Sequence, residues 1–422
     1  MRAPTQPPSK VTLVTAMSSA LMISGACVTT QSYAQTSTPK KSEEIETFFI
    51  SDQYSYDDNL FRLSESADLT DPLNAGIVSR EDYVNRLTVG LGEDLELGRQ
   101  VFTLQARAHD VRFSENDHLD HMAGNGALGW DWLITDAITG TIKGRYTREL
   151  ADFANSRGVF KDVLETLAYE SSVRFKLGPR WSVLAGGQHT ETEHGLELRR
   201  ADNFEANTGR AGIQYTTPAQ HTFALEYRVI DAQFPNRVPD PALELQSGDY
   251  EENAALARVG YTFSVHTQLQ AMYGYVEREQ QDDPTDRFSG DIWRAELSWQ
   301  PRPKFSTKVA AWRELRAYID AESDYFISDG FSFTPTWTPI RQLSLSLAAA
   351  WEDQEYLGFD PLDPGVIGRV DDVFSGLATI VYSPRPNLDF ELNYKAFDRA
   401  SNRLLRNYDA QVAGLSIRWR IL

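Results

Sequence analysis

The chain has 422 residues, 41% of them hydrophobic, with 41 Lys and Arg against 60 Asp and Glu. No run of about 18 or more apolar residues follows the N-terminal region, which excludes a helical membrane protein. The acidic excess argues against nucleic-acid binding, which calls for a basic face. A transmembrane β-barrel fits this composition, because its strands are apolar only at every second residue.

The N-terminal segment has the pattern of an export signal. Arg2 gives a positive start, a mostly apolar stretch follows over 11–28, and Ser32-Tyr33-Ala34 offers a small-x-small cleavage site. We therefore expect a signal peptide over 1–34, a flexible leader over 35–45 and one barrel domain over 46–422.

A lipoprotein signal ending at Cys27 is the competing interpretation of the same segment. It requires an aliphatic residue three positions before the cysteine, where this chain has Ser24. Cleavage after Ala34 would remove the only cysteine, so the mature chain would contain no disulfide and no cysteine chemistry.

The rest of the chain alternates apolar and polar side chains. In LDFELNYKA (388–396) the apolar residues stand at every second position, and segments 223–229 and 343–352 follow the same rule. This period of two is typical of a β-strand with one apolar face.

Turn signals divide these strands at intervals of roughly 40 residues, the scale of a hairpin repeat. The signals are Leu97-Gly98-Arg99, Thr135-Asp136, Gly178-Pro179-Arg180, Thr217-Pro218-Ala219, Val265-His266, Pro301-Arg302-Pro303, Thr338-Pro339 and Ser383-Pro384-Arg385-Pro386. Longer polar segments lie between them, as at 57–82, 231–250, 278–288 and 355–371.

Short turns alternating with longer loops predict an all-β fold, a transmembrane antiparallel up-and-down barrel of about 18 strands. The number falls to about 16 if a terminal hairpin is misassigned. The turns would be periplasmic and the loops external, in the outer membrane of a Gram-negative bacterium. A soluble β-propeller has a similar repeat, but its strands are usually shorter and its outward faces less apolar.

Tryptophans near the apolar-polar borders are typical of the interfacial girdles of such barrels. They are Trp130, Trp132, Trp181, Trp299, Trp337, Trp351 and Trp419.

If the apolar positions face lipid, the alternate positions line the pore, and many of these are basic. The pore-lining candidates are Arg107, Arg145, Arg174, Arg210, Arg228, Arg258 and Arg294, with Lys143, Lys176, Lys308, Lys395, Arg418 and Arg420 also on this face. They could bind an anionic or hydroxyl-rich solute weakly at many points, as a conduit requires. The simpler interpretation is that they pair with inward carboxylates across strands.

The histidines do not indicate an enzyme. His221 and His266 fall at expected periplasmic turns, and His189 and His194 would point to opposite faces of one strand. The segment 109–121 gathers histidine and aspartate without the spacing of a defined metal site. We expect no catalytic residues, no metal and no cofactor.

The stretch YSYDDNLFRL (54–63) begins an ordered set of motifs that resembles one family. The others are LELGRQVF (95–102), WDW (130–132), RELADF (148–153), YRVIDAQFPNR (227–237), RFSGDIWRAELSWQPRPKFS (287–306) and FDRASNR (397–403). Together they are similar to the EpsL-like outer-membrane β-barrel proteins of exopolysaccharide biosynthesis clusters, which are associated with exosortase systems. The first motif carries over Asp57, Asp58, Asn59, Leu60, Phe61 and Arg62.

The resemblance implies a part in exopolysaccharide biosynthesis or export, as a passive conduit for the polymer. Its implied partners are the exopolysaccharide chain, periplasmic and inner-membrane export components, and outer-membrane lipid. A general porin for small solutes and a non-conducting scaffold of the synthesis complex are the alternatives. One departure from outer-membrane barrels is that the chain ends Trp419-Arg420-Ile421-Leu422, without a terminal aromatic residue.

Overall fold

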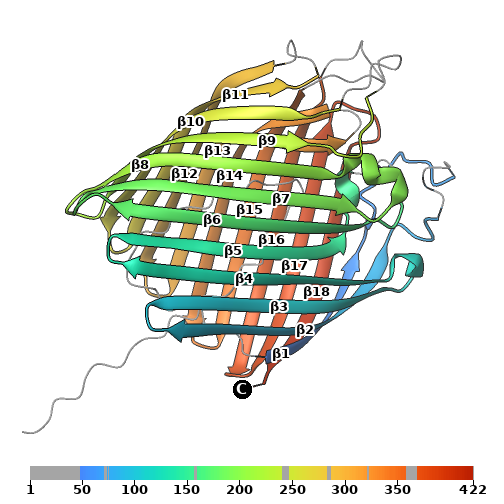
Figure 1. Ribbon diagram of the computed structural model, residues 1–422. Helices are drawn as coiled ribbons and strands as arrows, with labels where there is room; N and C mark the ends of the chain where they lie inside the picture. Colours follow the sequence, from blue (N-terminus) through green and yellow to red (C-terminus); the bar gives the residue numbers. More distant parts are fainter. Residues whose placement is uncertain are drawn as a thin grey trace, which may run out of the picture.

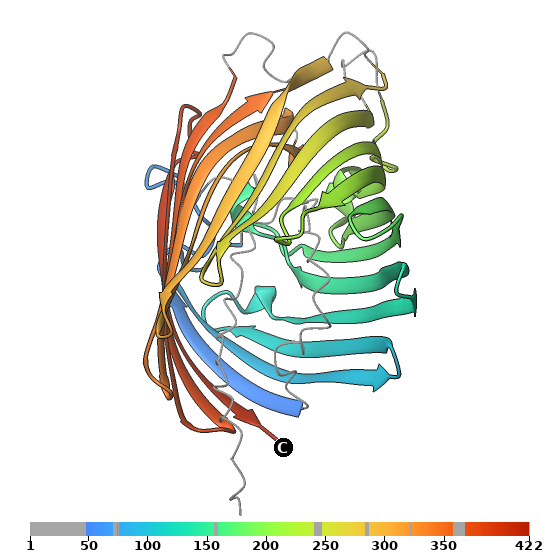
Figure 2. The same ribbon diagram turned by 90° about the vertical axis from the view of Figure 1, so that its left-hand side faces the viewer.

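The computed structural model describes residues 48–421, except 71–73, 75, 156–158, 240–246, 283–286, 321–322 and 358–367. Over these ranges the chain forms one 18-stranded antiparallel sheet, which the pairing of β1 with β18 closes into a barrel (Figures 1 and 2). The expected signal peptide and leader lie outside the described residues. No helix in the described ranges is long and apolar enough to cross a membrane.

Every strand pairs with its neighbours along the chain. The strands are β1 Phe48–Asp57, β2 Asp82–Leu97, β3 Gln100–Phe113, β4 His121–Thr135, β5 Ile138–Leu150, β6 Val163–Lys176, β7 Trp181–His194, β8 Phe204–Thr216, β9 Thr222–Gln233, β10 Tyr250–Ser264, β11 Thr267–Gln280, β12 Arg287–Arg302, β13 Phe305–Asp320, β14 Ser323–Ile340, β15 Leu343–Leu357, β16 Val370–Arg385, β17 Leu388–Ser401 and β18 Tyr408–Arg420. Short 3-10 helices η2 Asp117–Leu119, η3 Phe153–Asn155 and η4 Glu197–Asp202 lie in the loops.

The alternation of tight turns and longer loops is confirmed, and so is the count of 18 strands. The 16-strand alternative and the propeller are wrong. Gly98 shows why a turn falls where it does, because its φ of +66° in the two-residue link from β2 to β3 suits glycine.

Three prolines predicted to lie in turns lie instead near the ends of strands. Pro301, Pro339 and Pro384 belong to β12, β14 and β16, each where the ladder shifts its register. Proline has no N–H to donate to a ladder, so it is tolerated at such irregularities and not in regular pairing. The turns themselves fall one to three residues later.

The strands also continue further toward the loop end than the polar segments predicted. β11 reaches Gln280 and β15 reaches Leu357. All strands except the ten-residue β1 have 12–18 residues, more than the roughly 9–11 that cross a bilayer, so their outer ends can be polar and still remain in the ladder.

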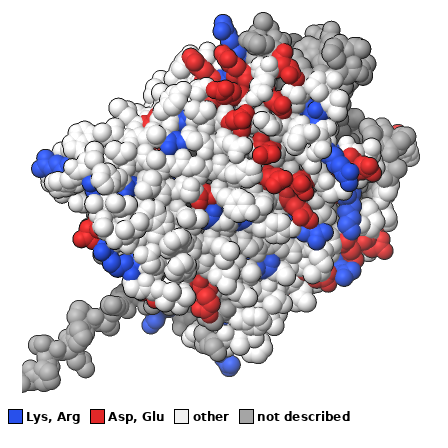
Figure 3. Space-filling view, in the orientation of Figure 1, with Lys and Arg blue, Asp and Glu red and all other residues white. Residues whose placement is uncertain are grey.

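The outward face is apolar over most of the barrel wall. Leu128 and Leu225 are more than 60% exposed, as lipid-facing side chains are in an isolated barrel. Figure 3 shows carboxylates gathered over part of this face, with wide uncharged areas beside them. The register places all of the predicted girdle tryptophans on the outward face, and most lie near the short-turn ends of their strands.

The stretch that begins the family motif starts on this outward face. Tyr54 stacks on Tyr83 of β2 with ring centroids 5.7 Å apart. Asp52, the polar exception on this face, accepts a hydrogen bond from Asn85 Nδ2 at 2.8 Å. Asp57 then turns into the barrel, where it is buried.

Candidate functional site in the barrel lumen

The register places the predicted pore-lining arginines on the inward face. Arg107 lies on β3, Arg145 on β5, Arg174 on β6, Arg210 on β8, Arg228 on β9, Arg258 on β10 and Arg294 on β12. On β9, for example, Arg228 is 9% exposed while its neighbour Tyr227 is 54% exposed on the outer surface. Contact between these residues and a solute stays a prediction.

On the wall formed by β8–β15, the inward charges are partnered. Glu252 of β10 lies between two guanidinium groups: Arg228 Nη2 donates to it at 2.8 Å and Arg278 Nη2 at 2.7 Å. All three side chains are nearly buried, and Arg278 also stacks 3.9 Å from the ring centroid of Tyr250. A buried carboxylate shared by two arginines holds three adjacent strands in register.

A second partnered group continues around the same wall. Arg294 donates to Glu314 at 3.1 Å, and Arg316 bridges Glu314 at 3.2 Å and Glu352 at 3.1 Å. The hydroxyl of Ser328 completes the group with a 2.8 Å hydrogen bond to Glu352. The charges therefore form a connected network over β12–β15.

Two further predicted arginines are also in ion pairs. Arg210 contacts Glu170 at 2.6 Å, and Arg258 contacts Glu226 at 3.3 Å. Most of the inward charge on this wall is therefore neutralised by neighbouring side chains. This agrees with the simpler interpretation of the sequence, in which inward cations pair with carboxylates across strands.

The bulky inward side chain of Trp312 does not project into the lumen, because its ring lies along the wall. It packs over Gly330 of β14, where an added Cβ would stand 2.4 Å from the ring, and its Nε1 donates to Ser328 at 3.1 Å. Glycine at position 330 is what lets the large ring lie flat against the strand.

The wall formed by β17, β18 and β1–β5 differs at mid-barrel. Phe49 lies between Arg107 and Arg418, whose guanidinium carbons are 5.8 Å and 5.1 Å from its ring centroid. Arg145 is exposed and makes no hydrogen bond or ion pair with any residue that the structure describes. Lys143 beside it is also exposed to the lumen.

The family motif closes part of the mouth above this wall. Arg62 adopts a φ of +54°. Its Nη1 and Nη2 donate hydrogen bonds to the two carboxylate oxygens of Asp57, at 2.7 Å and 2.9 Å. Asn59 Nδ2 donates to the carbonyls of Leu63 at 2.9 Å and Asp409 at 2.8 Å. These bonds tie the start of the first long loop to β18.

Other members of the motif extend the same attachment. The backbone N–H of Asp58 donates to Gln411 at 3.1 Å, and that of Leu60 to Arg80 at 2.8 Å. Burial lowers the pKa of the Arg62 guanidinium, but the bonds to Asp57 outweigh it and leave that pKa raised.

Phe61 anchors a small hydrophobic core, which we call the mouth cluster. It consists of Phe61, Val111, Phe113, Leu119, Ala123, Phe153 and Val159. Phe61 and Phe153 come from different loops and meet edge to face, with centroids 4.9 Å apart. Three loops are thereby packed against the inner surface of β3 and β4.

The loop between β5 and β6 extends beyond the mouth cluster to β17, which lies beyond β1 and β18 in the barrel. Arg399 of β17 donates from Nη1 to the carbonyl of Ala154 at 2.6 Å, a contact 245 residues apart in sequence. Figure 2 shows loop segments inside the barrel outline, away from its rim. The mouth is therefore narrower than the barrel itself.

The far end of the same loop is fixed by Asp162, which is 2% exposed. His194 Nδ1 lies 2.6 Å from its Oδ2, and the N–H of Leu196 donates to its Oδ1 at 3.0 Å. Burial alone would raise the pKa of Asp162, but these hydrogen bonds outweigh it and hold the pKa below its ordinary value.

The histidine-rich segment does not assemble a metal site. His109 is directed inward, where its Nδ1 lies 2.8 Å from Thr88 Oγ1, whereas Asp110 and Asp120 both contact Arg112. In the described part of the chain, no group of three or more possible metal ligands occurs.

Several inward residues were missed by the sequence interpretation, notably Arg86, Glu252, Arg278, Glu314 and Arg316. Arg278 was assigned to the polar segment 278–288, whereas β11 continues to Gln280. The alternation of inward and outward side chains continues past the apolar part of each strand, and this signal could have identified them.

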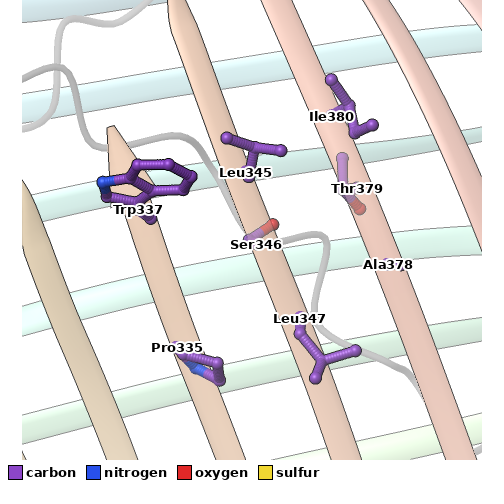
Figure 4. A pocket seen from close by; sticks show the side chains of 8 residues that line it. All are labelled: Pro335, Trp337, Leu345, Ser346, Leu347, Ala378, Thr379 and Ile380. Carbon is purple, nitrogen blue, oxygen red and sulfur yellow. The ribbon is translucent and has the colours of Figure 1, made fainter. Parts of the chain in front are cut away.

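Open concavities lie on the outer surface. One is a groove of about 320 Å³ lined by Pro335, Trp337, Leu345, Ser346, Leu347, Ala378, Thr379 and Ile380. Figure 4 shows these side chains on three neighbouring strands, with the opposite wall behind them. Its lining is almost wholly apolar, as suits contact with lipid acyl chains.

The chain is distantly similar to several solved structures. Pseudomonas aeruginosa OpdK with vanillate is 9% identical, with 88% of this chain and 97% of that chain covered and a TM-score of 0.44. Pseudomonas aeruginosa OccK2 (OpdF) is 8% identical, with 89% and 98% covered and a TM-score of 0.46. The alcaligin receptor FauA of Bordetella pertussis is 11% identical, with 89% and 76% covered and a TM-score of 0.39.

No curated protein matches the chain. The family model described as "Putative beta-barrel porin 2" matches residues 188–421, more than half of the chain. The closed barrel, the apolar outer face and the charged lumen of this chain are consistent with that match. The chain therefore belongs to that family of outer-membrane β-barrel porins.

Proposed function

We propose that the protein is a passive channel for hydrophilic solutes across the outer membrane, and not an enzyme. The observation that carries this is the difference between the two faces of one closed sheet: apolar outside, hydroxyl-rich and charged inside. A barrel of this strand number is wide enough for an aqueous path unless loops fill it. The mouth cluster narrows the entrance, which favours small solutes.

A second candidate is passage of an exopolysaccharide. The ordered motifs of the EpsL-like resemblance favour it, since the first of them forms the locked loop at the mouth. In this case the partners are the polymer and the periplasmic and inner-membrane export components, and the chain reaches the outer membrane after cleavage of its signal peptide.

Planar-bilayer conductance of the purified protein tests the channel. We expect discrete conductance steps, with neutral polymers of increasing size excluded from the pore above a cut-off. A correctly folded barrel that never conducts would instead indicate a scaffold.

Experiments on gene deletion and on vesicles distinguish a channel for small solutes from one for the polymer. If the channel serves small solutes only, deleting the gene leaves secreted exopolysaccharide unchanged, and vesicles reconstituted with the protein swell faster in sugars than vesicles without it. If secreted polymer falls and a wild-type copy restores it, passage of the polymer is supported. Replacing Arg145, Arg174, Arg228 and Arg258 together by Ala, at normal barrel abundance, then tests the arginines, and unchanged secretion would rule out their role.

A further inference from the structure

Arg86 of β2 and Lys395 of β17 differ from the partnered cations of the lumen. Both are half-buried on the inward face, on either side of β1 and β18. Neither makes a hydrogen bond or ion pair with any residue in the described ranges. Most other half-buried lumen arginines have at least one carboxylate or aromatic ring in contact.

The charges around Lys395 leave it without a close counter-ion. Two cations, Arg86 and Arg62, lie near Lys395. The carboxylates near Lys395 are those of Asp57, which forms an ion pair with Arg62, and Glu391. Neither carboxylate lies within 4.0 Å of the ammonium group.

Arg86 is in a similar position. Among the described residues, the carboxylate near Arg86 is Glu149 on the inward face of β5, and it makes no ion pair with Arg86. On its other side are His109 and His121, which both experience the charge of Arg86. Each of these imidazoles is hydrogen-bonded, His109 to Thr88 and His121 to the carbonyl of Leu119.

Partly desolvated cations that repel each other are unfavourable unless an anion lies between them. A guanidinium group binds a carboxylate through two parallel N–H donors, and an ammonium group adds a point charge. Gln53, directly opposite Arg86 in the ladder and also inward, has a side-chain amide with no partner among the described residues. An amide beside the cations can bind hydroxyl groups of the same solute.

We propose that Arg86, Lys395 and Gln53 form a binding site in the lumen for the carboxylate end of a small hydroxylated acid. This inference rests on the proposed channel function and names its substrate class. Arg86 lies directly opposite Val111 of the mouth cluster in the β2–β3 ladder, so the site borders the narrow entrance. The neutral parts of the solute remain in the aqueous lumen.

The test compares wild type with the double variant Arg86→Gln and Lys395→Gln, using sodium gluconate as the anion and sorbitol as its neutral counterpart. Gluconate should block the wild-type chloride current and raise the melting temperature of the protein in detergent, whereas sorbitol should do neither. The double variant should bind gluconate about tenfold to a hundredfold more weakly, as expected for losing charge-assisted hydrogen bonds.

Arg148→Gln is the matched control, because it removes one positive charge from the outward face, where Arg148 pairs with Glu165. Its gluconate block and thermal shift should equal those of wild type. Lys395→Arg keeps the charge and should retain most of the binding, which also guards against a variant that fails to fold.

The outcomes separate the site from the channel. Conductance without any gluconate effect in wild type, or an equal effect in the double variant, overturns the site and leaves the channel. A gluconate-dependent thermal shift that the double variant lacks, in a protein that never conducts, supports the site and overturns the channel.

Discussion

The wall of β8–β15 and the wall of β17, β18 and β1–β5 present similar residue types to the lumen but partner them differently. On the first, Glu252 and Glu314 each hold two arginines. On the second, Arg86, Arg145 and Lys395 make no hydrogen bond or ion pair within the described ranges. Inward charge therefore serves the structure of the first wall, whereas on the second wall three cations remain available to solutes beside ion pairs such as Arg420–Asp389.

The two walls also differ in what lies above them. The mouth cluster and the Asp57–Arg62 pair cover strands of the second wall, so the loops direct a solute past its unpartnered cations. On the first wall Arg278, Tyr250 and Tyr325 stack near the loop end of the strands. Aromatic and ionic packing there fills space that a solute could otherwise occupy.

The largest expected effect comes from Glu252→Gln on the partnered wall. It leaves Arg228 and Arg278 buried without a counter-charge, which we expect to lower the free energy of unfolding by about 3–5 kcal/mol. Urea unfolding followed by tryptophan fluorescence measures it. Glu251→Gln, at an exposed neighbour on the outward face, is the control, and equal unfolding midpoints for the two variants would contradict the structural role of this wall.

Phe61→Ala acts on the loops above the other wall. Removing this 1% exposed ring from the mouth cluster should destabilise the packed loops by about 3 kcal/mol. Proteolysis of the external loops should accelerate and single-channel conductance should rise. Leu404→Ala, at a loop side chain that is 93% exposed, should change neither, and an unchanged conductance in Phe61→Ala would show that the cluster does not narrow the path.

Asp162→Asn should destabilise the loop between β5 and β6 by about 2 kcal/mol at neutral pH, since it removes hydrogen bonds to a charged group. Because the folded pKa of Asp162 is lowered, its contribution is present above the unfolded value of about 3.9 and is lost as pH falls through the folded pKa. The difference in loop proteolysis between wild type and variant should therefore shrink on acidification below about pH 4. A difference that grows on acidification would contradict this assignment.

The smallest effect on stability is expected for Arg145→Gln. Its side chain is exposed and unpartnered among the described residues, so unfolding should change by less than about 0.5 kcal/mol. The anion-to-cation permeability ratio of the channel, measured from the zero-current potential in a KCl gradient, should fall. A loss of stability like that of Glu252→Gln would remove the distinction between the walls.

Most of the fold could be predicted from sequence because alternation and turn residues are local signals. The period of two identified both faces of the strands, and even the inward placement of Arg210 and Arg258 followed from it. The prolines near strand ends were misassigned, since a register shift depends on the partner strand and not on the proline alone.

The candidate site could be predicted less well. Which arginines are partnered depends on carboxylates two strands away, as Arg210 of β8 and Glu170 of β6 show, and on rotamers that sequence does not specify. The mouth cluster joins three loops that are distant in sequence, and no local pattern brings them together. Arg86 was missed although it occupies an inward position of a predicted strand.

The most direct test of the difference between the walls is chemical access from the lumen. Arg145→Cys and Arg228→Cys, each made with Cys27→Ser, are treated with a water-soluble, negatively charged methanethiosulfonate reagent while the channel current is recorded. The account predicts rapid modification and an altered current for Arg145→Cys, and much slower modification for Arg228→Cys behind its ion-paired neighbours. Equal rates at the two positions would contradict it.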